Sequence, residues 1–377
     1  MIYLDYAATT PLNAQVLDTY NDLLKKYFYN ADSIYNKGIE VNRLMEKSRD
    51  LIANTFKVKS NEIIFTSCGS EANSMALKGL AFQYQNRGKH IITSAIEHSS
   101  VYESCQQLQN LFGFEVTYLP VDKTGHISLD DLKNAIRDDT IIVSIMYVNN
   151  ELGAIQPIDQ IKQLLTNYPL IKFHVDMVQA LGKLPIDLTN IDCASFSAHK
   201  IYGLKGSGIL YKNQATTIVP LISGGQQEFS LKGGTSNACT NIVLAKTLRL
   251  AMDKQSEKLK YINDLNTYLV KELTKIKDVV INTGGDSSPC IINFSCIGYK
   301  PEVILHDLEQ YDIYISTRSA CSSKTSDVSR VMAQLNIDEA IASSALRVSL
   351  SDLTTIEEID KFIYHLANSL KNIKKQR

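Results

Sequence analysis

Ser195-Phe196-Ser197-Ala198-His199-Lys200 ends a short apolar stretch with two hydroxyl groups, an imidazole and an amine. A lysine amine is protonated and strongly hydrated in water, so it becomes a nucleophile only where its neighbours lower its pKa. Residues 201–208 follow with three glycines, which let the backbone approach a ligand closely. The segment therefore predicts a site where Lys200 condenses with a phosphorylated aldehyde. Taken alone, the segment leaves an ordinary solvated lysine as the alternative.

Short apolar runs alternate with amphipathic stretches between about residues 60 and 215. This alternation is typical of successive βα units in a mostly parallel sheet, so we predict an α/β fold. Ligands gather at the carboxyl ends of the strands in such a sheet, and the residues that follow each strand are therefore candidates for the site. The expected strands are residues 62–66, 90–94, 115–119, 141–148, 172–175, 193–196 and 208–211.

The chain beyond about residue 240 predicts one long helix that connects to a smaller α/β domain. Apolar residues recur at helical spacing from Ile242 to Leu269. We expect a large domain over residues 15–255 and a small domain formed by residues 1–14 and 256–377. In the small domain we expect strands at 290–294, 311–315 and 346–350, and helices at 301–309 and 356–370.

The composition is that of a globular protein with 377 residues, of which 44% are hydrophobic, and a formal net charge of −1. This charge gives no electrostatic reason to expect nucleic acid or an anionic membrane as the main partner. The beginning of the chain lacks a basic region followed by an apolar run, and no window reaches the roughly 18 apolar residues that span a bilayer. We expect a cytoplasmic protein.

The chain has seven cysteines, without any C-x-x-C pair. This odd, scattered set suggests neither a disulfide framework nor a metal site, and we expect most of the thiols to be small core residues. Cys321 differs because it lies in a polar loop where Arg318 and Lys324 favour the thiolate. A reactive thiol is the functional interpretation, and an incidental exposed thiol is the alternative.

Asp176 closes an apolar run and delivers a carboxylate to the carboxyl edge of the predicted sheet. A buried acid needs a cationic partner. A protonated pyridine nitrogen would be one, and Gln179, three residues on, could present its amide to a ring hydroxyl. An acid that caps a helix or sits in a loop is the alternative.

Other polar residues follow the neighbouring strands. Gly69 and Ser70 lie between a strand and a helix, an arrangement that binds anions, although Ser70 as an ordinary N-cap explains the stretch equally well. His98 could stack on a planar ring or move protons, and a structural histidine is its alternative. Asn150 leaves a strand in a polar run that turn chemistry explains about as well as ligand binding. Arg347 inside an apolar strand requires an anionic partner, which is either the carboxylate of a substrate or an acidic side chain in an internal ion pair.

These elements, in this order, resemble cysteine desulfurases of the NifS and IscS type, which belong to the class V group of pyridoxal-phosphate enzymes. The resemblance spans nearly the whole chain. It is carried by the stretches Tyr3-Leu4-Asp5-Tyr6-Ala7-Ala8-Thr9-Thr10-Pro11, Val148-Asn149-Asn150-Glu151, His174-Val175-Asp176, Ser197-Ala198-His199-Lys200-Ile201-Tyr202-Gly203, Ser319-Ala320-Cys321-Ser322-Ser323 and Ala345-Leu346-Arg347-Val348-Ser349.

The resemblance implies the fold type I architecture of pyridoxal-phosphate enzymes, with a mostly parallel seven-stranded sheet in the large domain. It implies that Lys200 bonds to the cofactor aldehyde, that His98 stacks on the ring, and that Arg347 binds the carboxylate of L-cysteine together with Asn150. Thr235 would reach the phosphate from the second subunit of a homodimer. The implied cofactor-binding residues are Gly69, Ser70, His98, Asn150, Asp176, Gln179, Ser197, His199, Lys200 and Thr235.

The implied reaction converts L-cysteine to L-alanine. Lys200, Cys321 and His98 are the implied catalytic residues, and Cys321 would take the sulfur as a persulfide on a mobile loop. The sulfur would pass to an acceptor protein of iron-sulfur cluster assembly or of tRNA or cofactor thiolation. A selenocysteine or cystine lyase of the same family and a non-catalytic scaffold that docks a sulfur acceptor are the alternatives.

Three positions depart from the family pattern. Arg318 stands where a glycine is common, and Lys232 stands where an arginine is common. The phosphate loop reads Ser67-Cys68-Gly69-Ser70-Glu71 in place of the usual Ser-Gly-Ala-Thr-Glu. An arginine beside the thiolate would suit a specialised acceptor, such as one in tRNA thiolation.

Overall fold

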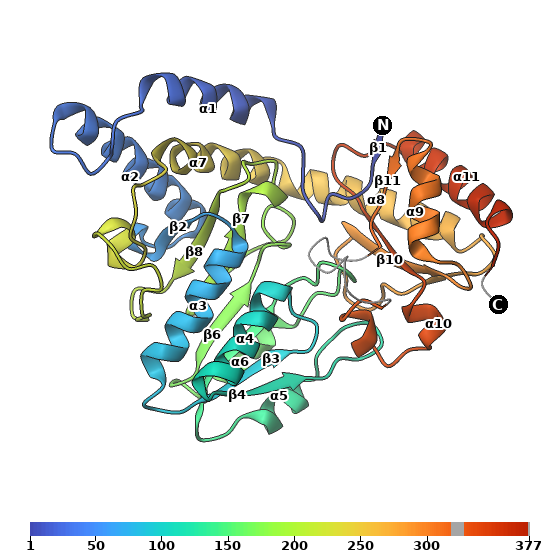
Figure 1. Cartoon of the computed structure of the whole chain (residues 1–377), viewed down its shortest axis with the longest axis horizontal. Helices are drawn as coiled ribbons and strands as arrows, with labels where there is room; N and C mark the ends of the chain where they lie inside the picture. Colours follow the sequence, from blue (N-terminus) through green and yellow to red (C-terminus); the bar gives the residue numbers. More distant parts are fainter. Residues whose placement is uncertain (318–327, 376–377) are drawn as a thin grey trace.

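The computed structural model describes residues 1–317 and 328–375. Figure 1 shows two bodies, each built around its own sheet, with α7 (Ala238–Met252) in the larger body and α8 (Gln255–Leu273) leading into the smaller one. Within the described ranges, no helix is long and apolar enough to cross a membrane.

The larger sheet has the strand order β2-β8-β7-β6-β5-β3-β4, a total of seven among the described residues. Its strands are β2 (Ile63–Thr66), β3 (His90–Ser94), β4 (Glu115–Leu119), β5 (Thr140–Met146), β6 (Lys172–Asp176), β7 (Cys193–Ser197) and β8 (Gly208–Lys212). Only β8 runs against its neighbours in this set, and all seven predicted strands are confirmed to within a few residues. The carboxyl ends of the six other strands therefore meet at one edge.

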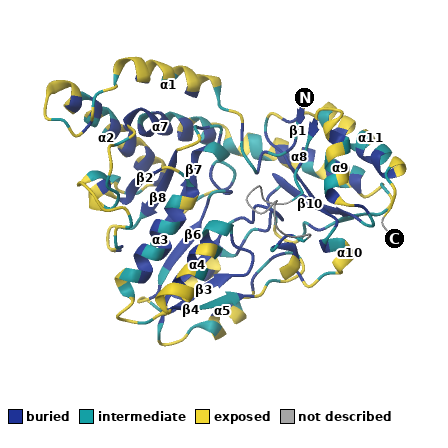
Figure 2. Ribbon diagram, in the orientation of Figure 1, coloured by how far each residue is buried: buried dark blue, intermediate teal, exposed yellow. Residues whose placement is uncertain are grey.

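Successive side chains of these strands enter two different cores. Ile63 and Phe65 pack in one apolar cluster, whereas Ile64 between them packs in another, and Ile92 and Ile91 divide in the same way. This is the period of two that a strand imposes on its side chains. Helices cover both faces, which leaves these strands largely buried except for the edge strand β4 (Figure 2). These helices are α2 (Asn36–Phe56), α3 (Gly69–Tyr84), α4 (Ser99–Phe112), α5 (Leu129–Ala135), α6 (Ile158–Leu165) and α7, and α1 (Ala14–Lys26) packs on the outside of α7.

The smaller body contains an antiparallel sheet of order β12-β10-β9 with its own apolar core. The first strand of the chain, β1 (Ile2–Tyr3), pairs with β11 (Ile313–Tyr314), so the beginning of the chain joins the C-terminal body. The other elements are β9 (Val279–Ile281), β10 (Ile291–Cys296), α9 (Pro301–Glu309), α10 (Glu339–Ala342), β12 (Ala345–Ser349) and α11 (Ile356–Asn372).

The single long helix expected after residue 240 is wrong, because the chain forms α7 and α8 with a break between them. Asp253 has extended backbone angles, and Lys254 has a left-handed φ of 53°. No glycine or proline marks this break, although residues 253–258 are all polar and interrupt the apolar spacing. The change of direction lets α7 stay on the large sheet while α8 packs in the core of the smaller body.

A buried ion pair holds the segment that leads to Thr235. The guanidinium of Arg49 on α2 donates to both carboxylate oxygens of Glu228, at 2.7 and 2.9 Å, and Phe65 N donates to the same carboxylate at 2.8 Å. Glu228 begins a run of three non-glycine residues with positive φ angles of 46°, 57° and 64°. Such backbone persists only where the surrounding structure fixes it, and here Arg49 does so.

We predict that Arg49→Leu lowers the free energy of unfolding by about 3–5 kcal/mol, because it leaves the Glu228 carboxylate buried without its cation. The double variant Arg49→Leu/Glu228→Gln should recover part of this loss. Urea denaturation of the cofactor-free protein measures both values. A loss below about 1 kcal/mol in the single variant, as for a surface pair, would contradict a structural role for this contact.

Candidate active site

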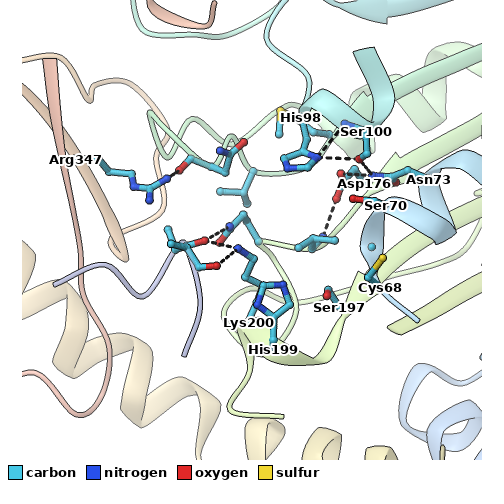
Figure 3. Close-up of a pocket in the computed structure, with 18 residues that line it drawn as sticks. Cys68, Ser70, Asn73, His98, Ser100, Asp176, Ser197, His199, Lys200 and Arg347 are labelled. Atoms are coloured by element: carbon cyan, nitrogen blue, oxygen red, sulfur yellow. Dashed lines mark hydrogen bonds between the residues drawn. The ribbon is translucent and has the colours of Figure 1, made fainter. Parts of the chain in front are cut away.

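The polar residues that follow the strands meet around one cavity of about 180 Å³ at the carboxyl edge of the large sheet (Figure 3). Arg347 on β12 of the smaller body lies on the opposite side of this cavity from Asp176. The predicted residues that line it are Gly69, Ser70, His98, Asn150, Asp176, Gln179, Ser197, His199, Lys200 and Arg347.

Two predicted residues are not placed in this cavity. Thr235 is exposed and does not line it within the chain. Cys321 lies outside the described residues, as do Arg318 and Lys324. Among the described cysteines, Cys68 is partly buried and lines the cavity, and the rest are buried: Cys105, Cys193, Cys239, Cys290 and Cys296.

Lys200 follows β7 in a short turn, and its amine is held by the first residues of the chain. Lys200 Nζ donates to Ala7 O at 2.6 Å and to Ala8 O at 2.7 Å. Thr10 fastens the same segment, because its backbone N and its hydroxyl both donate to His199 O at 3.0 Å. The N-terminal segment therefore forms part of the cavity wall and orients the amine.

Asp176 is buried at the end of β6 and accepts hydrogen bonds from neutral groups. Asn73 Nδ2 donates to Asp176 Oδ2 at 2.8 Å, and Val178 N donates to Asp176 Oδ1 at 3.0 Å. Both of these donors leave the carboxylate charge uncompensated. A buried carboxylate of this kind is stabilised by a cation that enters the cavity.

The hydrogen bonds around His98 determine which ring nitrogen carries the proton. Ser100 N donates to His98 Nδ1 at 3.2 Å, so Nδ1 is an acceptor. Ser100 Oγ lies 2.8 Å from the same nitrogen and itself accepts from Asn73 Nδ2, which leaves its own proton for His98. A neutral His98 therefore carries its proton on Nε2. Asn73 thus connects Asp176 to His98.

The beginning of α3 provides an anion site. The N-cap of α3 is Cys68, without a side-chain capping bond, so the alternative that Ser70 caps this helix is wrong. The N–H groups of the first turn lack intrahelical partners and face the cavity with the positive end of the helix dipole. A Cβ on Gly69 would lie 2.8 Å from Val178 Cγ2, so any larger residue there would require Val178 to shift. Ser197 Oγ is buried and has no hydrogen-bond partner among the described residues.

His199 adds a neutral imidazole to this wall of the cavity. Its burial, together with the charges of Lys200, Lys205 and Lys183, lowers the pKa of His199 to about 4. Thr9 Oγ1 lies 3.1 Å from His199 Nδ1. An anion bound nearby would counteract these positive charges, so the site is prepared for a negatively charged group.

Arg347 is buried on β12 and takes part in an internal ion pair while it lines the cavity. Arg347 Nη2 donates to Asp5 Oδ1 at 2.6 Å, and Arg347 Nη1 donates to Asn150 O at 2.7 Å. Arg347 Nε is buried without a partner in the described part of the chain. The internal ion pair expected from the sequence is therefore present. It does not use all the N–H groups of Arg347, so the binding of an anionic ligand also remains open to this residue.

The model of the aminotransferase class-V family matches residues 2–362. The chain belongs to this family. It is 43% identical over 95% of its length to the cysteine desulfurase IscS of Dictyoglomus turgidum, of which it covers 92%. It is also 43% identical to a NifS/IcsS protein homolog of Lactobacillus delbrueckii subsp. bulgaricus, over 96% of this chain and 95% of that one. A solved NifS-like protein, 35% identical, superimposes with a TM-score of 0.93 over 99% of this chain and all of its own.

Members of this family use pyridoxal phosphate, and the cavity fits that cofactor. Asp176 has no cationic partner among the described residues, and a protonated pyridine nitrogen would supply one. The helix start at Gly69 and the unpartnered hydroxyl of Ser197 match the needs of a phosphate. The amine of Lys200 lines the same cavity.

Sequence reasoning missed two residues that shape this site. Asn73 was assigned no role, although a polar residue three positions after Ser70 on an otherwise apolar helix face was a usable signal. Asp5 belongs to a stretch that carries the family resemblance, but no role was expected for it. Its contact with Arg347 joins residues 342 positions apart. No local pattern indicates a contact of that separation.

We predict that the NMR signals of His199 in the cofactor-free protein titrate with a midpoint near the lowered pKa of about 4. The folded state disfavours the imidazolium, so the unfolded chain binds the extra proton between pH 6.5 and about 4, and acidification through this window lowers stability. His199→Gln should remove both the signal and its share of this pH dependence. A midpoint at or above the ordinary value of 6.5 would contradict the buried, positively charged surroundings described above.

Proposed function

We propose that this chain is a pyridoxal-phosphate-dependent cysteine desulfurase that converts L-cysteine to L-alanine and transfers the sulfur through Cys321. The observation that carries the proposal is one cavity that joins the Lys200 amine, the uncompensated Asp176 carboxylate and the Arg347 guanidinium. A family relative with 43% identity carries the name cysteine desulfurase. The cavity and the relationship support the same activity independently.

When bound, pyridoxal phosphate supplies an electron sink that weakens the Cα–H bond and then the C–S bond of cysteine. In the proposed site Asp176 would keep a proton on the pyridine nitrogen, and His98 would stack on the ring. Gln179 faces the ring hydroxyl and is oriented by Ala7 O, which accepts from its Nε2 at 3.0 Å. Gly69, Ser70, Ser197 and His199 hold the phosphate.

Lys200 performs two tasks in this proposal. Its amine would bond to the aldehyde of the cofactor, and the same amine would accept the α-proton of cysteine. The carbonyl oxygens of Ala7 and Ala8 are the acceptors that orient Nζ for this transfer. Arg347 and Asn150 hold the α-carboxylate of cysteine and so fix the Cα–H bond relative to the amine.

Cys321 then acts as the nucleophile. Its thiolate sulfur bonds to the substrate sulfur as the C–S bond breaks, and the bonding electron pair stays with the carbon fragment. Protonation of that fragment releases L-alanine, and the sulfur remains on Cys321 as a persulfide that an acceptor thiolate can attack.

The oligomer, the acceptor and the location are parts of the same proposal. A homodimer would bring the exposed Thr235 of one chain to the phosphate of the other. An acceptor protein of iron-sulfur cluster assembly or of tRNA or cofactor thiolation would take the sulfur.

The described cysteines are free, which suits a reducing compartment such as the cytoplasm. Two sheets with separate cores support a large domain over 15–255 and a small one formed by 1–14 and 256–377.

Two alternatives differ in what they turn over. A selenocysteine or cystine lyase would process those amino acids in preference to cysteine, so comparing the three substrates separates these enzymes. A scaffold that only docks a sulfur acceptor would need none of Lys200, Cys321 and Arg347, and it would yield no alanine even with acceptors present.

We predict that the purified protein is yellow and releases equal amounts of alanine and sulfide from cysteine and a thiol reductant. Cys321→Ser should lower sulfide release at least roughly a hundredfold, since the nucleophile is lost, while cysteine still changes the absorbance of the bound cofactor. Cys239→Ser is a matched control, because Cys239 is buried away from the cavity. Normal sulfur delivery by Cys321→Ser would refute the proposed route.

A further inference from the structure

The segment that follows the Cys321 loop is attached to both loops that carry cavity residues. Ser329 Oγ donates to the buried carboxylate of Glu151 at 2.5 Å and accepts from Val331 N at 3.1 Å. Glu151 is the immediate neighbour of Asn150, in the loop after β5. The position of Ser329 is thus tied to the residue that follows Asn150.

Arg330 makes the second attachment. Arg330 Nη1 donates to Ala95 O at 2.5 Å, and Arg330 Nη2 donates to Glu97 O. Its guanidinium carbon lies 4.2 Å from the ring centroid of Tyr102 on α4. Ala95 and Glu97 lie between β3 and His98, which is the N-cap of α4. The guanidinium therefore contacts the loop before His98 and the helix after it.

Apolar side chains of the same segment also pack against both loops. Val331, Met332 and Leu335 form one buried cluster with Ile96 of the β3 loop and Leu152 of the β5 loop. The same short segment therefore bridges the loops of His98 and Asn150. A shift of this segment would disturb contacts to both loops at once.

The other end of the Cys321 loop is also attached to the site. Ser316 N donates to Arg347 O at 3.1 Å, and Arg347 N donates to Ser316 O at 2.7 Å. Residues 317–328 therefore begin at the strand of Arg347 and end at the segment of Ser329 and Arg330. In the sequence, Cys321 lies between these two attachments.

We propose that Arg330 and Ser329 are positioning residues for sulfur transfer, which fix the C-terminal end of the Cys321 loop to the loops of His98 and Asn150. This inference rests on the proposed desulfurase function. Neither residue lines the cavity, and both act through backbone or carboxylate groups next to the cavity residues. If these contacts only stabilised the fold, their loss would slow every step of the reaction equally. If they position Cys321, their loss slows mainly the step in which Cys321 takes the sulfur.

The test compares Arg330→Ala, Arg330→Lys and Ser329→Ala with the control Arg87→Ala in the cofactor-loaded enzyme. Arg87 also donates to a backbone carbonyl and lies over a tyrosine ring, but it precedes β3 at the opposite end of that strand. Rapid mixing with cysteine measures the absorbance change of the bound cofactor. Mass spectrometry of quenched samples measures persulfide on Cys321 in the first turnover.

We expect Arg330→Ala to keep the rate of the absorbance change within about twofold and to slow persulfide formation at least about tenfold. Ser329→Ala should show a smaller effect of the same kind. Arg330→Lys should recover part of the rate, because an ammonium can donate to one or both carbonyls without the planar fork. The control should change neither rate.

Equal slowing of both rates in Arg330→Ala, or an unchanged persulfide rate, would overturn the proposal. A wild-type enzyme that makes no alanine would instead refute the proposed function. In that case the rate of Cys321 alkylation by iodoacetamide, measured without cysteine, still tests the positioning role. We expect Arg330→Ala to change this rate at least about threefold and Arg87→Ala to leave it unchanged, since Arg330, unlike Arg87, contacts the loop that carries His98. Equal alkylation rates in wild type and Arg330→Ala would reject the inference.

Discussion

The carboxylate of Asp176, buried at the end of β6, constrains the rest of the site. It accepts hydrogen bonds from Asn73 Nδ2 and Val178 N, which are neutral donors. A negative charge in such surroundings is costly unless a cation compensates it. The sheet delivers this carboxylate to the edge where the other strands end, and the proposed cofactor supplies the missing positive charge. Asn73 also holds Ser100 and, through it, the ring of His98.

The N-terminal segment connects the two bodies at the same place. Its strand β1 pairs with β11 of the smaller body, and its carbonyl groups at Ala7 and Ala8 accept from Lys200 of the larger one. Asp5 of this segment also binds Arg347. The proposed cofactor lysine and the proposed substrate arginine therefore share one support, so that a movement of the first eight residues would affect both.

Local sequence patterns predicted the features that are themselves local. The seven strands of the large sheet follow from short apolar runs. The residues around the cavity were found because polar groups after parallel strands meet at one edge. The contacts that orient them were missed, since Asn73 and Asp176 are 103 positions apart and no local pattern links them. The break at Asp253 and Lys254 was missed because no glycine or proline marks it, and the polar run 253–258 is also compatible with an exposed turn of one continuous helix.

The central claim is that one amine, that of Lys200, holds the cofactor opposite Asp176. Borohydride reduction of the loaded protein, followed by peptide mass spectrometry, locates that bond directly. Lys183 is a demanding internal comparison, because it donates to Gln179 Oε1 at 3.0 Å and burial lowers its pKa. We expect a single pyridoxyl group on the peptide that contains Lys200 in the wild-type protein. In the Lys200→Ala variant this peptide should carry no pyridoxyl group. A group on Lys183 or another lysine in the wild-type protein would contradict it.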